Sequence, residues 1–163
     1  MNKREITEIL SLFVLAYPGT KVFEGGIPKL EPMINLWHIS LLDIPYSLAK
    51  DAALQICRES KFPPTIAEFR AKAEEVRKSI HYEVLEGVLF IRDRLLDHTP
   101  EEVLAQLAPG SPMRVVIEAM GGPARLIDRN GRFNYLEFSD NYERLLCTQK
   151  AGGGPAILLD KSK

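Results

Sequence analysis

Residues 66–97 contain no proline and a single glycine, Gly87, over a length that helices of globular domains rarely reach. Thr65 and Glu68 precede the apolar repeat with the spacing of a capping box, in which a hydroxyl and a carboxylate satisfy free backbone donors reciprocally. The stretch therefore predicts either one long helix that joins two units, or two helices with a bend near Ser79 or Gly87.

Shorter apolar repeats on the N-terminal side of this stretch predict three further helices. In the first, Ile6, Ile9 and Phe13 recur at the three- and four-residue spacing of one helix face. Residues 19–31 contain three glycines and one proline, and so predict a loop. Together with the start of the long helix, these segments make a complete small helical unit. The predicted helices cover residues 3–16, 32–43 and 45–60.

Beyond residue 97, proline and glycine divide the chain into short helical segments. Thr99 and Glu102 form a second capping box, and Ser111 followed by proline repeats the cap-then-proline pattern. Asn130-Gly131 predicts a turn; the pair also permits a hairpin, but no strand pair is predicted to flank it. The predicted helices cover residues 100–107, 112–120 and 135–150, with one more turn over 123–128.

The segments together predict an all-α chain. A compact N-terminal four-helix unit is joined through the long helix to a C-terminal helical region that ends in a flexible tail. The hydrophobic fraction of 45% and the charged fraction of 26% are ordinary values for a globular protein of 163 residues. The predicted domain boundaries are residues 1–78, 79–150 and, for the glycine-rich tail, 151–163.

The formal net charge of −1 gives the chain no overall attraction for nucleic acid, so contact with single-stranded DNA is expected to be weak or indirect. The apolar run from Ile9 to Tyr17 is too short to span a bilayer and lacks a small-residue cleavage pattern. We interpret it as a core helix. We expect a cytoplasmic protein without a membrane partner, in which Cys57 and Cys147 are reduced thiols.

The sequence contains none of the short motifs that mark phosphate loops, nucleophile elbows or zinc-binding helices. The two cysteines and three histidines lack the spacing of zinc ligands. Asp93 and Asp97 lie four residues apart on one predicted helix, but Arg92 and Arg94 flank the first of them, which indicates a solvated face of mixed charge. We therefore expect neither an enzyme nor a bound cofactor or metal.

The C-terminal region combines arginines with aromatic residues, which is the composition of protein-binding hot spots and also of single-strand nucleic-acid platforms. Residues 111–150 hold six basic and five acidic groups, and this near balance weakens the nucleic-acid interpretation. A helical pair with a mixed-charge surface remains an equally simple interpretation. The residues concerned are Arg114, Arg125, Arg129, Arg132 and Arg144, among Phe133, Tyr135, Phe138 and Tyr142.

Several short motifs occur in a characteristic order along the first half of the chain. Their order is Tyr17-Pro18, then Trp37, then Leu41-Leu42-Asp43-Ile44-Pro45, then Ser60-Lys61-Phe62-Pro63-Pro64-Thr65-Ile66-Ala67-Glu68. Over about residues 5–75, the chain resembles bacteriophage replicative helicase loader/inhibitor proteins. The stretch from Ser111-Pro112 to Tyr142 is also similar to the ends of phage replication proteins.

The resemblance implies an adaptor of phage DNA replication. Such a protein binds the hexameric replicative helicase of the host, inhibits it and delivers it to origin DNA, which a phage origin-binding initiator marks. In the family the N-terminal helical unit is the folded part and the C-terminal part engages the helicase, which here implies residues from about 111 onward. Composition and helical facing, rather than the family pattern, select the partner-binding candidates Arg132, Phe138, Tyr142, Arg144 and Leu145.

Two other functions fit the residues as well. The first is a nucleic-acid-binding regulator that places a C-terminal helix in a groove. The second is a self-associating structural or assembly factor that uses the apolar half of the long helix, Val84 to Leu96. An affinity for nucleic acid that falls steeply with salt would indicate the first function, and self-association would indicate the second.

Overall fold

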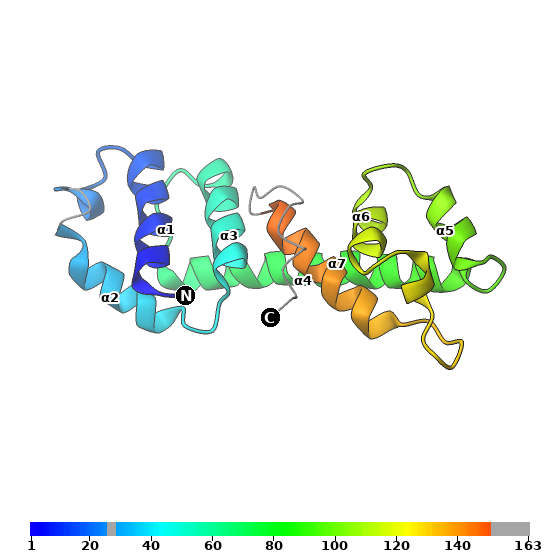
Figure 1. Cartoon of the computed structure of the whole chain (residues 1–163). Coiled ribbons are helices and arrows are strands. Elements are labelled where there is room, and N and C mark those ends of the chain that lie inside the picture. The colour runs from blue at the N-terminus through cyan, green and yellow to red at the C-terminus, as the bar shows by residue number, and fades with distance from the viewer. Residues whose placement is uncertain (26–28, 151–163) are drawn as a thin grey trace. The chain divides into compact units, whose positions relative to one another are not determined.

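The computed structural model describes residues 1–25 and 29–150, of Lys150 only the backbone, and it is all-α over these residues (Figure 1). The predicted tail, residues 151–163, lies outside the described part. The chain divides into two compact units, Met1–Arg77 and Lys78–Lys163, which we call the first and the second unit. The helices are α1 Lys3–Ala16, η1 Lys21–Phe23, α2 Glu31–Ser40, α3 Tyr46–Glu59, α4 Ile66–Arg94, α5 Pro100–Gln106, α6 Pro112–Ala119, η3 Pro123–Leu126 and α7 Tyr135–Lys150.

The first unit is built around three aromatic rings that come from different helices. Phe13 of α1, Trp37 of α2 and Phe69 of α4 lie with their ring centroids 5.2–6.1 Å apart. Phe13 and Phe69 are completely buried, and the exposed fraction of Trp37 is 5%. Because α1 also packs against α3, its predicted apolar face lies in the centre of the unit. The helix that was predicted over residues 3–16 is thus confirmed.

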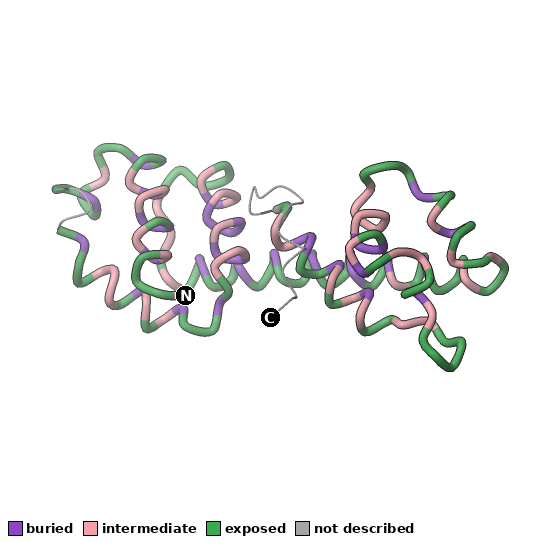
Figure 2. The backbone as a smooth tube through the Cα atoms, viewed as in Figure 1, coloured by how far each residue is buried: buried purple, intermediate pink, exposed green. Residues whose placement is uncertain are grey.

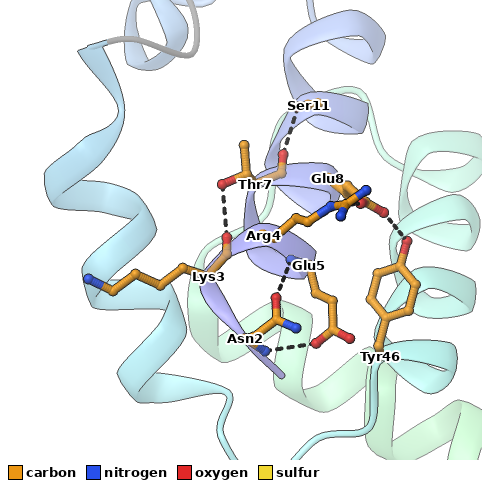
Figure 3. A network of polar contacts seen from close by, with 8 residues as sticks. All are labelled: Asn2, Lys3, Arg4, Glu5, Thr7, Glu8, Ser11 and Tyr46. Carbon is orange, nitrogen blue, oxygen red and sulfur yellow. Dashed lines mark hydrogen bonds and ion pairs between the residues drawn. The ribbon is translucent and has the colours of Figure 1, made fainter.

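Polar contacts fix the start of α1 (Figure 3). The Asn2 side chain accepts a hydrogen bond from the backbone N–H of Glu5 at 2.9 Å, and the Glu5 carboxylate accepts one from the backbone N–H of Asn2 at 2.7 Å. Further along α1, the Tyr46 hydroxyl donates to the Glu8 carboxylate at 2.6 Å, which ties α3 to α1. This bond raises the pKa of Tyr46 to about 12.

One arginine joins the end of α2 to α4. The Arg70 guanidinium donates to both carboxylate oxygens of Asp43, at 2.8 and 2.7 Å, and to the backbone carbonyl of Ser40 at 2.5 Å. The contact to Ser40 satisfies a carbonyl in the last turn of α2, where no helical partner is left. Helix α2 therefore ends at Ser40, three residues before the predicted end.

The long stretch forms one helix, α4, so the alternative of a bend is wrong. The capping box at its start is present, since Thr65 and Glu68 exchange hydrogen bonds at 2.7–3.3 Å. Gly87 continues the helix, and it lies against the ring of Tyr142 in α7. A β-carbon at position 87 would be only 2.3 Å from Cε1 of that ring. The glycine is thus a packing position rather than a hinge.

In the second unit, α6 packs against α7, and η3 packs against α5 and α6 (Figure 1). The core is apolar and comes from every helix of the unit, as the buried segments in Figure 2 show. Its members are Ile80, Val84, Ile91, Val103, Leu107, Val116, Ile117, Leu126, Phe138, Tyr142, Leu145 and Leu146, each at most 8% exposed.

Two local predictions for the second unit need correction. Ser111 precedes α6 but does not cap it, because its buried Oγ atom has no hydrogen-bond partner among the described residues. The Asn130-Gly131 turn does have a flanking pair, since Ile127 and Phe133 form an isolated antiparallel bridge. A single bridge leaves no strand-length pattern in the sequence. By contrast, Thr99 and Glu102 do form the predicted capping box of α5.

Candidate protein-interaction surfaces

Three of the five predicted partner-binding residues are core residues. Phe138, Tyr142 and Leu145 are 0%, 3% and 1% exposed, so these three candidates lie inside the second unit and not on its surface. Their three- and four-residue spacing marks one face of α7, and that face packs into the unit. Arg132 and Arg144 are exposed, but Arg132 precedes α7 whereas Arg144 lies within it, twelve residues further on.

The exposed candidate, Arg132, belongs to a short ordered hairpin before α7. We call residues 128–132 the hairpin tip; it projects from the second unit (Figures 1 and 2). The Asp128 carboxylate accepts hydrogen bonds from the backbone N–H groups of Asn130 and Arg132, at 2.8 and 2.9 Å. The Asp128 N–H donates to the Arg132 carbonyl at 2.8 Å, and Gly131 has the left-handed φ of 74° that the turn requires.

The polar contacts also fix the charge of the tip. The N–H of Arg132, aided by that of Asn130, holds the pKa of the Asp128 carboxyl below its ordinary value. The carboxylate is therefore ionised at neutral pH and faces the backbone of its own turn. Of the described residues, none forms an ion pair with the guanidinium of Arg129 or Arg132. Both side chains are exposed.

Other arginines of the region are already bound within the unit. Arg114 donates to the Glu118 carboxylate at 2.9 Å and to the Leu107 carbonyl at 3.2 Å. Arg125 donates to the Glu137 carboxylate at 3.2 Å. These contacts separate arginines that hold the fold together from arginines that remain available to a partner.

Two apolar side chains follow the tip at the start of α7. Tyr135 is 53% exposed and Leu136 is 60% exposed. Together with Arg129 and Arg132 they form what we call the tip surface. Its composition is that of a protein-binding hot spot. Sequence reasoning singled out Arg132 but missed Leu136. The position of Leu136 outside the 138–142–145 face of α7 could have indicated that its side chain is exposed.

The first unit has an exposed apolar surface of its own. Leu36 and Ile39 lie on the outer side of α2 and Leu42 follows in the next turn, with exposed fractions of 57%, 70% and 58%. We call these three residues the α2 face. Trp37, between the first two, points into the core instead. Neighbouring exposed apolar residues on a small unit are typical of interaction sites.

Helix α4 carries a third exposed apolar group within the second unit. Tyr82, Leu85 and Leu89 are 65%, 45% and 37% exposed. We call them the α4 stripe. It corrects the expected self-association face, Val84 to Leu96, because Val84 and Ile91 of that range are buried in the core.

The described residues contain no group of three or more histidines, cysteines or carboxylates that could hold a metal ion. None of the described helices is long and apolar enough to cross a membrane. The features that stand out on the two units are exposed apolar and cationic side chains, which are the kind that bind other macromolecules.

Comparison with known families finds a similarity that lies within the first unit. Residues 1–70 match the family model for the N-terminal domain of phage helicase loader/inhibitor proteins. This match confirms the resemblance to that family for this part of the chain. No curated protein matches the chain, and no solved structure does.

Several of the motif residues within the matched stretch build the fold of the first unit. The Tyr17 hydroxyl donates to the Ile56 carbonyl at 3.2 Å, Trp37 lies in the aromatic core, and Asp43 pairs with Arg70. These positions hold α1, α2, α3 and α4 together. The motifs that carry the resemblance thus occupy structural positions and do not mark where the protein binds.

Proposed function

We propose that the protein is a phage replication accessory factor that binds the hexameric replicative helicase of the bacterial host, inhibits it and delivers it to origin DNA. The observation that carries the proposal is the match of residues 1–70 to the loader/inhibitor N-terminal domain. The site of action would be the host cytoplasm. The helicase itself supplies the ATP chemistry, so the adaptor needs no catalytic site.

The surfaces support two separate contacts. The second unit would face the helicase through residues 111–150, where Arg132 and Arg144 are the exposed members of the predicted set. Delivery to an origin requires a second contact, with the initiator protein bound there. The α2 face of the first unit is an exposed apolar surface that suits this second contact.

An unwinding assay tests the proposed function. The full-length protein is titrated into the host helicase acting on a forked DNA substrate, with ATP hydrolysis measured in parallel. We expect unwinding to fall as the protein approaches equimolar amounts with helicase subunits. Unchanged unwinding and ATP hydrolysis at saturating protein would contradict the proposal.

Self-association is the second candidate function, and the α4 stripe favours it. Tyr82, Leu85 and Leu89 recur at the narrow spacing of a helix–helix seam. Light scattering over a range of concentrations separates this function from the first. A protein that stays monomeric at every concentration would contradict self-association.

A further inference from the structure

We infer that the tip surface binds a carboxylate-bearing protein surface through the exposed guanidinium groups of Arg129 and Arg132. The identity of the partner as the helicase rests on the proposed function, whereas the chemistry of the contact follows from the tip itself. The matching surface of the partner protein would present acidic side chains beside an apolar residue.

The charges of the tip call for an acidic partner. The two guanidiniums are exposed and form no ion pair with the described residues, while the neighbouring Asp128 carboxylate accepts from two backbone N–H groups. A guanidinium presents its donors as a planar fork that matches a carboxylate with two parallel hydrogen bonds. The tip therefore offers two guanidinium groups without an ion pair among the described residues, although the charge of Arg132 also helps to lower the pKa of the nearby Asp128 carboxyl.

The backbone of the tip is ordered before any partner arrives. Two hydrogen bonds to Asp128, the bridge between Ile127 and Phe133, and a bond from the Asn134 N–H to the Leu126 carbonyl at 2.8 Å hold it. An ordered backbone lowers the entropy lost on binding. This distinguishes the tip from arginines on a long unrestrained loop.

The neighbouring residues favour a protein over a nucleic acid. Leu136, 60% exposed, offers an apolar side chain at the start of α7, four residues after Arg132. Asp140 and Glu143 follow it at four and seven residues on the same side of α7, and both are exposed. Carboxylates in that position repel a phosphate backbone that runs along α7, and they equally confine an acidic protein partner to the tip itself.

The test compares paired variants of the full-length chain. Affinity for the host helicase is measured by fluorescence anisotropy for the wild type, Arg129→Ala/Arg132→Ala and Arg129→Lys/Arg132→Lys. Arg58→Ala, at an exposed arginine of the first unit, is the matched control. We expect the alanine pair to bind the helicase about tenfold more weakly than the wild type, or weaker still. The affinity of the lysine pair should lie between those of the wild type and the alanine pair, and the control should match the wild type.

Two probes that do not depend on the helicase accompany this titration. One is a synthetic helical peptide with leucine and glutamate side chains on one face. The other is a single-stranded oligothymidylate of about 20 nucleotides. We expect the wild type to bind the peptide, the alanine pair to lose it, and neither to bind the oligonucleotide.

The outcomes separate the two proposals. If the wild type binds the helicase and the alanine pair binds within about twofold of it, the inference about the tip fails and the proposed function stands. If the wild type does not bind the helicase, the proposed function fails and the peptide decides the inference. A third result is that the wild type binds the oligonucleotide with an affinity that falls steeply with salt, while the alanine pair does not bind it. That result would overturn the inference about the tip in favour of a nucleic-acid site.

Discussion

At the residue scale, Gly87 shows how a missing side chain can hold two helices together. Alanine in a helix interior is ordinarily more favourable than glycine by about 1 kcal/mol. Here a β-carbon would lie 2.3 Å from Cε1 and 2.9 Å from Cδ1 of Tyr142. Because the ring is buried, it has little room to retreat. The steric cost therefore outweighs the helix propensity.

Gly87→Ala is expected to lower the free energy of unfolding by about 1–3 kcal/mol, the usual cost of overpacking a core. Urea unfolding of the full-length chain, followed by circular dichroism, measures it. In a Tyr142→Ala background the ring is gone, and the same substitution should become stabilising. If Gly87→Ala stabilises the chain with Tyr142 present, the α4–α7 packing described above is incorrect.

The pair of Asp43 and Arg70 gives the first unit a defined response to acid. Hydrogen bonds from Arg70 are the main cause that lowers the pKa of Asp43 from 3.8 to about 2. A carboxyl whose pKa is depressed by folding stabilises the folded state above its unfolded pKa and loses that contribution as pH falls through the folded value. The contribution of this pair is therefore complete above about pH 4 and is lost towards pH 2.

Asp43→Asn should consequently unfold at a lower temperature than the wild type at neutral pH, and the gap should narrow between pH 4 and pH 2. Thermal unfolding at a series of pH values tests this. A gap that stays constant down to pH 2 would contradict the assignment.

At the element scale, two helices begin with the same sequence signal and differ in structure. Thr99 accepts a hydrogen bond from the Glu102 N–H at 3.3 Å and thereby caps α5. Ser111 stands at the same position of α6, yet its buried hydroxyl has no partner among the described residues. A buried unsatisfied hydroxyl is unfavourable.

We therefore expect opposite results from substituting Thr99 and Ser111. Thr99→Ala should destabilise the chain by about 1 kcal/mol, the usual value for a lost helix cap. Ser111→Ala should be neutral or stabilising, since it removes an unsatisfied polar group. Chemical denaturation of the two variants side by side measures the difference. Equal losses in both would show that Ser111 does cap α6.

Element positions followed from the sequence where two signals agreed. For α1 and α7, an apolar repeat ends at a clear stop, and both helices occupy the predicted residues. The pattern could not tell whether the apolar face of α7 is covered by its own unit or offered to a partner. Phe138, Tyr142 and Leu145 were for that reason placed on the wrong side. Arg129 stood out from the other arginines only when their ion pairs were known.

At the scale of the whole molecule, the family match covers the first unit, and the interaction chemistry of the second unit has to come from its geometry. Helices α6 and α7 supply much of the core of the second unit, so removing residues from 111 onward would disrupt the unit itself. Substitutions on the exposed tip surface test the contact without that consequence.

Binding to a hexameric replicative helicase is the interaction on which the proposed function depends. The most direct measurement mixes the full-length chain with the host helicase and resolves the mixture by size-exclusion chromatography with light scattering, with and without ATP. We predict a complex that elutes earlier and has a greater mass than the helicase alone. Separate elution of the two proteins both with and without ATP would contradict binding to the helicase.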